Sequence, residues 1–110
     1  MQSTPIFSPP VVATATLAAN RFVTFAGALC GAGAKALGVT QYAAAVGDAV
    51  AANVLGTTKV EAGGAVAVGG PVKSDAAGKA IAQGGTGEIL GYAMEAASGD
   101  GKVFEILLTP

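Results

Sequence analysis

Side chains that could act in acid–base or nucleophilic chemistry are few in this chain and lie far apart along it. The sequence has seven acidic residues, no histidine and a single cysteine, Cys30. Without histidine, the usual catalytic triads and the common His-containing metal sites are excluded, and no imidazole is present to activate Cys30. We therefore expect Cys30 to be a small buried or loop residue, and we expect no catalytic residue, no metal site and no cofactor.

The carboxylates show no spacing that would bring two of them together for general acid–base catalysis. Three lie in predicted turns, where an Asp side chain can accept a hydrogen bond from the backbone two residues further on: Asp48, Asp75 and Asp100. Three others are expected at strand edges or on a solvent-exposed face: Glu61, Glu88 and Glu105. Because these positions have structural explanations, the sequence predicts a protein that is not an enzyme.

Charge is sparse and balanced, with six basic and seven acidic residues and no run of like charge. A nucleic-acid-binding protein would carry a basic stripe or basic residues interleaved with aromatics, so nucleic acid is not expected as a partner. The start of the chain lacks the basic and apolar regions of a signal peptide. No stretch of about eighteen apolar residues is free of glycine and charge, so the sequence predicts no transmembrane helix and no membrane partner.

The elements that hold these side chains are predicted to be short β-strands. The sequence has 17 glycines, and they separate apolar, β-branched runs at intervals typical of a β-sandwich or β-barrel. We predict strands at 11–19, 21–25, 49–55, 57–61, 65–68, 72–74, 88–94 and 102–108, a strand that contains Leu37-Gly38, and a brief segment at 79–82. The alanine-rich stretch 42–46 is compatible with one helical turn. The predicted fold is therefore all-β, a compact sandwich or barrel of short strands.

One sequence pattern occurs twice. LGVTQYAAAVGDAV at 37–50 corresponds to LGYAMEAASGDGKV at 90–103, and apolar strands precede and follow each copy. The internal repeat therefore covers about 21–57 and 71–109. We interpret it as two duplicated β-units that cannot each bury a face alone and that close one core together.

Two dipeptides carry this correspondence. Leu37-Gly38 matches Leu90-Gly91, and Gly47-Asp48 matches Gly99-Asp100. The Gly before each Asp suits a turn with positive φ. Glycine inside a strand indicates a bulge or a close approach of another backbone, which we expect at Gly38 and Gly91.

Residues 1–10 are predicted to form an extended N-terminal arm, followed by a single β-domain at 11–110. Proline fixes φ and lacks a backbone donor, so a helix is excluded in this segment. Two interpretations are open: a disordered terminus, or an arm that docks on a neighbouring protein with Ile6 and Phe7 as apolar anchors. In the second, the partner-binding residues are Pro5, Ile6, Phe7, Pro9 and Pro10.

The order of the motifs RFVTF, GAGAKALGV, GDAVAANVLGT, VEAGGAVAVGGPVKSDAAGKA and GEILGYAMEAAS resembles the head decoration, or capsid cement, proteins of tailed bacteriophages. The resemblance covers residues 11–108 and is strongest at 60–80 and 88–96. It implies a structural virion protein on the outer surface of the capsid, assembled in the host cytoplasm, commonly as a homotrimer. Its partner would be the major capsid protein, whose neighbouring subunits it would clamp in the expanded shell.

Two other classes of function stay open on sequence alone. One is a different structural β-module, such as a phage tail or spike subunit or a bacterial surface protein. The other is a ligand-binding domain or minor enzyme, which would need a pocket with convergent polar groups.

Overall fold

The computed structural model describes residues 4–7 and 10–108, and the regular structure in these ranges is all β-strand. The strands are β1 (Thr4–Phe7), β2 (Pro10–Val12), β3 (Phe22–Val23), β4 (Gly38–Thr40), β5 (Ala49–Asn53), β6 (Leu55–Glu61), β7 (Pro71–Ser74), β8 (Ala80–Ala82), β9 (Gly91–Ala93) and β10 (Val103–Leu108). The all-β prediction is confirmed. The stretch 42–46 forms no helical turn and contributes Ala44 to a bridge with Leu17.

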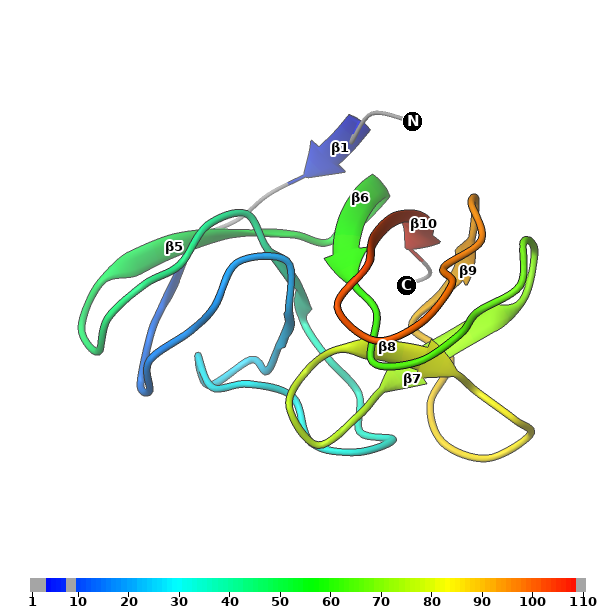
Figure 1. Ribbon diagram of the computed structural model, residues 1–110. Coiled ribbons are helices and arrows are strands. Elements are labelled where there is room, and N and C mark those ends of the chain that lie inside the picture. Colours follow the sequence, from blue (N-terminus) through cyan, green and yellow to red (C-terminus); the bar gives the residue numbers. More distant parts are fainter. Residues whose placement is uncertain (1–3, 8–9, 109–110) are drawn as a thin grey trace.

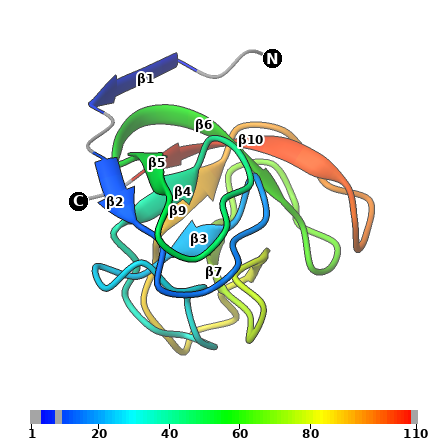
Figure 2. The ribbon, with the colours of Figure 1, turned by 90° about the vertical axis from the view of Figure 1, so that its left-hand side faces the viewer.

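The strands form two antiparallel sheets, and each sheet takes most of its strands from one half of the chain. The four-stranded sheet has the order β2-β5-β4-β3, and the six-stranded sheet has the order β1-β6-β10-β9-β7-β8. In Figure 1 the first half lies at the left and the second half at the right, with β6 between them. Figure 2 shows β2, β3, β4 and β5 together on the side that lies at the left of Figure 1.

Several strands are shorter than predicted. The predicted strand 11–19 ends at Val12, the strand 21–25 is reduced to β3, and 65–68 keeps only a bridge from Val66 to Ala97. In these stretches the chain turns after two or three paired residues, so alternation in the sequence overstates strand length. The predicted break at Gly56 is also wrong, because Gly56 takes a φ of +88° within β6 and the strands separate at Val54 instead.

The two sheets contain the same arrangement of strands. The order β2-β5-β4-β3 in the first half matches the order β6-β10-β9-β7 in the second. Leu17 and Ala44 exchange two backbone hydrogen bonds of 2.8 and 3.0 Å, and Val66 and Ala97 exchange two of 3.0 and 2.9 Å. We propose that these matched sets of strands are the two copies of the repeat, with β2 and β6 at their starts.

The turn before the last strand of each half corrects one detail of the sequence alignment. Gly47 has a φ of +91° and its N–H donates to the Ala13 carbonyl at 2.8 Å. The residue with the same role in the second half is Gly101, with a φ of +84° and an N–H donating to Ala62 at 2.9 Å. The match of Gly47 with Gly99 is therefore wrong, because the second turn is longer.

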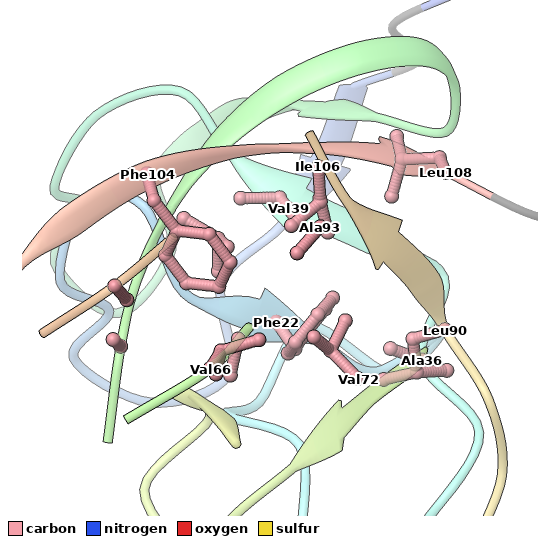
Figure 3. Close-up of a cluster of buried hydrophobic side chains, with 14 of the residues drawn as sticks. Phe22, Ala36, Val39, Val66, Val72, Leu90, Ala93, Phe104, Ile106 and Leu108 are labelled. Atoms are coloured by element: carbon pink, nitrogen blue, oxygen red, sulfur yellow. The ribbon is translucent and has the colours of Figure 1, made fainter. Parts of the chain in front are cut away.

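The buried apolar side chains form two clusters rather than the single core expected. The smaller one lies within the first half and contains Ala13, Leu17, Val23, Ala44, Val50 and Ala52. The larger one joins the halves, because Phe22 and Val39 pack among side chains of the second half such as Phe104 and Ile106 (Figure 3). Both Phe22 and Val39 are fully buried.

A chain of ion pairs also crosses between the halves. Arg21, next to β3, lies 3.4 Å from Glu61 in β6, and Glu61 lies 3.3 Å from the ammonium group of Lys79. Lys79 in turn pairs with Asp100 at 3.0 Å. The Arg21 guanidinium also donates to the Ala77 carbonyl at 3.1 Å, which fixes the 75–79 turn against the first half.

Gly38 and Gly91 lie where the backbones approach closely, as predicted. A Cβ on Gly38 would overlap the Asn53 carbonyl oxygen, and a Cβ on Gly91 would lie 2.6 Å from the Leu107 carbonyl oxygen. Both glycines occupy the same position in the middle strand of their half, so the constraint is backbone against backbone and no side chain can move to relieve it.

The variants Gly38→Ala and Gly91→Ala should each lower the free energy of unfolding by about 1–3 kcal/mol, the usual effect of overpacking. Gly31→Ala and Gly99→Ala are matched controls, since a Cβ at either position meets nothing within 4 Å. Urea unfolding followed by circular dichroism measures the difference. Equal unfolding midpoints for all four variants would contradict the close backbone approach.

Stability should also depend on pH through Lys79. Hydrogen bonds to Asp100 and Glu61 raise the pKa of Lys79. The stabilisation is therefore fully present below the unfolded pKa of lysine, about 10.4, and is lost as the pH rises through the higher folded pKa. Lys79→Met should lower stability at neutral pH and lose less of it on alkalinisation than the wild type.

Lys102→Met provides the control for this experiment, because Lys102 is exposed and the described structure records no ion pair for it. Urea midpoints measured across the alkaline range compare the three proteins. A wild-type decline no steeper than that of Lys79→Met would show that the ion pairs do not stabilise the fold.

Candidate binding surface

Cys30 is a buried structural residue, as predicted. Its side chain is fully buried, and its thiol donates to the Ala34 carbonyl at 3.4 Å. The Ser74 hydroxyl donates to the Cys30 carbonyl at 3.3 Å. Burial raises the pKa of the Cys30 thiol, which lowers its thiolate fraction and so its reactivity.

The aspartates stabilise turns or ion pairs. Asp75 accepts hydrogen bonds from the N–H groups of Ala77 and Lys79 at 2.8 and 2.9 Å, which confirms its predicted turn role. Asp48 accepts one from the Ala45 N–H at 3.1 Å. Within residues 4–7 and 10–108, no group of three His, Cys, Asp or Glu side chains is placed to hold a metal ion. The same ranges contain no helix long and apolar enough to cross a membrane.

Glu105 differs from the sequence prediction. It was expected on an exposed face or strand edge, but it is only 2% exposed on β10, which lies between β6 and β9. One Glu105 carboxylate oxygen has no hydrogen-bond partner among the described residues. The Glu105 N–H donates to the Glu95 carboxylate at 2.9 Å, and this bond lowers the pKa of Glu95.

The predicted partner-binding arm is divided between the two sheets. Pro5, Ile6 and Phe7 belong to β1, which pairs with β6 at the edge of the six-stranded sheet. In this pairing Pro5 lies opposite Gly56 and Phe7 opposite Leu55. The first part of the arm is thus extended and presents its second edge to the outside.

The end of the arm forms part of the other sheet. Pro10 begins β2, is exposed, and lies opposite Ala51 of β5. Pro9 lies outside the described residues. The structure therefore does not gather the predicted residues into one site, but places β1 and β2 along neighbouring edges of the two sheets.

Sequence reasoning missed an apolar surface on the six-stranded sheet. Leu107 of β10 lies opposite Tyr92 of β9, and Tyr92 lies opposite Pro71 of β7. We call these three residues the outer row. Leu107 is 46% exposed and Tyr92 40% exposed. Val103, 50% exposed, lies on the same face of β10, separated from Leu107 by the buried Glu105. Adjacent exposed apolar side chains of this kind are a candidate binding surface.

A comparison with solved structures shows a shared fold. The chain is similar to a solved structure titled "The crystal structure of head fiber gp8.5 N base in bacteriophage phi29", with a TM-score of 0.76 and 20% sequence identity. The alignment covers 94% of this chain and 93% of that one, and at this identity it shows a shared fold. No curated protein matches the chain.

A family model described as "Phage cement protein" matches residues 1–108. The match includes the arm and both halves of the domain, so it covers all the strands described above. The chain therefore belongs to the phage cement protein family, whose members are structural proteins of the phage head.

Proposed function

We propose that this protein decorates the outer surface of an expanded phage capsid and clamps neighbouring subunits of the major capsid protein. The observation that carries this proposal is the family match over residues 1–108. The role is structural and non-catalytic, with the protein added in the host cytoplasm as a homotrimer. A compact all-β domain with a β-strand at an open sheet edge suits it, because such an edge can pair with or pack on another protein.

The physical basis of such stabilisation is linkage. A protein that binds the assembled shell but not the separate subunits stabilises the shell by about 2.7 kcal/mol per site when its free concentration is a hundred times its Kd. Many identical sites act together on one capsid, so modest contacts suffice at each. The stabilised shell then resists the outward pressure of packaged DNA.

The arm is the part of the chain that we propose to contact the capsid. β1 and Pro10 of β2 lie along neighbouring sheet edges, and prolines restrict the unfolded conformations of the segment. Restricting those conformations reduces the entropy lost on binding. In this proposal Ile6 and Phe7 supply the apolar side chains, and the partner-binding residues also include Pro5, Pro9 and Pro10.

A second candidate is supported by the structural neighbour, which is the base of a phage head fiber. In this alternative the domain is the base of a spike or fiber on the same surface. The two candidates differ in what the domain carries, not in what it binds, so the same capsid experiment separates both from a non-capsid role.

Purified protein mixed with undecorated expanded capsids should bind saturably at or near the threefold positions and raise the temperature at which the capsids disrupt. Cryo-electron microscopy locates the added density, and thermal disruption assays measure the gain in stability. Dissociated major capsid subunits are the control and should bind far more weakly. Capsids that gain neither density nor heat resistance would refute the proposal.

The variant Ile6→Ser/Phe7→Ser should weaken capsid binding at least about a hundredfold, since each apolar side chain buried on binding contributes about 1.5–3 kcal/mol. Deleting residues 1–10 is a less clean test, because it also removes Pro10 from β2. The control is Val46→Ser/Val68→Ser, which removes two side chains that are 65% and 66% exposed. If both double variants bind capsids equally well, the arm is not the contact.

A further inference from the structure

The two halves of the chain place side chains at the same backbone positions in opposite environments. The first half has a row that we call the inner row, made of Phe22, Val39 and Asn53. Val39 lies opposite both Phe22 and Asn53 across β3, β4 and β5. All three are buried, at 0%, 0% and 4% exposed. The inner row is therefore covered throughout.

The outer row takes the same positions in the second half. Tyr92 lies opposite Pro71 and Leu107 across β7, β9 and β10, as Val39 does across β3, β4 and β5. Yet Tyr92 is 40% exposed and Leu107 is 46% exposed. The side chains of this row are apolar or aromatic, so an unoccupied surface of the right chemistry lies where the first half has a packed one.

The second half covers the inner row with its own interior. Phe22 and Val39 belong to the same buried cluster as Val60 and Leu90 of the second half, and Figure 3 shows Phe22 beside Val72 within that cluster. Val60 and Leu90 are 0% and 3% exposed. Both belong to the buried cluster that receives Phe22 and Val39, and we call these two residues the seat.

The first half has its own version of this seat. Val11 lies opposite Val50, as Val60 lies opposite Phe104. Val11 is only partly buried, although its counterpart Val60 is fully buried. It lies at the margin of the smaller cluster.

Leu37 is a second residue that is less buried than its counterpart in the second half, Leu90. The Leu37 N–H donates to the Val23 carbonyl at 2.8 Å, as the Leu90 N–H donates to Val72 at 2.9 Å. Leu37 is also only partly buried and lies, with Leu29, at the margin of the smaller cluster. Within one chain, the inner row is buried against the second half. The outer row and the matching seat of the first half are both partly exposed.

We propose that the outer row of one copy packs on the open seat of a second copy, formed by Val11, Leu29 and Leu37. This interface between two molecules would resemble the contact that the inner row makes with the second half inside a single molecule. It deepens the self-association in the proposed function, on which it rests, by naming the surfaces. Because row and seat are different surfaces, the contact is head to tail, and it forms a ring where the rotation between copies closes.

We favour a second copy as the partner. The partly exposed seat of the first half has the same backbone arrangement as the part of the second half that receives the inner row. Interfaces between identical subunits are also more apolar than the average protein surface. The outer row suits such an interface, since it offers Leu107, Tyr92 and Pro71 with no charge among them.

The first test is the oligomeric state of the purified protein without capsids. Sedimentation velocity should show self-association of the wild type at micromolar concentrations. Leu107→Lys and Tyr92→Lys should each weaken it at least about tenfold, as expected for residues at the centre of an interface. Val46→Lys, at a side chain that is 65% exposed in a turn of the first half, should associate like the wild type.

The second test distinguishes a head-to-tail contact from a symmetric one. Leu107→Lys has a damaged row and an intact seat, and Leu37→Lys has a damaged seat and an intact row. Each alone should be monomeric, but their mixture should form a one-to-one complex, because one intact row meets one intact seat. Circular dichroism checks that each variant is folded, and Val11→Lys replaces Leu37→Lys if the latter unfolds.

A wild type that stays monomeric at about 100 µM, well above a micromolar Kd, would overturn the proposal. So would unchanged association of Leu107→Lys, or a mixture of the two variants that stays monomeric. If the wild type is monomeric and Leu107→Lys loses capsid binding, the row contacts the capsid, and the proposed decoration of the capsid still stands without the homotrimer. Normal self-association without any capsid binding would refute the proposed function instead.

Discussion

The fold depends on the insertion of Phe22 and Val39 from the first half into the core of the second. The first half's own cluster is built mainly from alanine and valine, with Leu17 as its largest member. Burying one Val or Phe side chain contributes about 1.5–3 kcal/mol, so these two are a large part of what joins the halves. A unit with so thin a core would be marginal alone, so we infer that the two halves fold together.

The two halves share a backbone arrangement but differ in the side chains that decide what is inside. Asn53 is 4% exposed and its amide donates to the Thr58 hydroxyl at 2.7 Å, so this buried polar group is satisfied where β5 passes into β6. Leu107 occupies the same position in the second half. Its side chain has no polar group, so its burial would require an apolar neighbour and no hydrogen bond. A few side chains therefore determine that the inner row is buried and the outer row is exposed.

Local rules predicted the β class, β7, β10 and the close approaches at Gly38 and Gly91, because each follows from a glycine position or a β-branched run. These rules failed for features that depend on tertiary packing, such as the burial of individual side chains. Asn20 turns the chain with a φ of +60°, as Gly69 does with +79°, but only the glycine signals the turn clearly. The exposure of Leu107 and the burial of Glu105 were missed because alternation assigns residues to a face without saying whether that face is covered.

The distribution of charge limits how this protein can recognise a partner. Arg21, Glu61, Lys79 and Asp100 are engaged with one another between the halves, and the whole chain is only 12% charged. The proposed contacts with a capsid and with further copies therefore rely mainly on shape, strand edges and apolar side chains. Such contacts depend little on ionic strength, since salt screens only the electrostatic part. Binding of this kind suits the proposed attachment to a capsid shell, because that shell is released into surroundings of varied ionic strength.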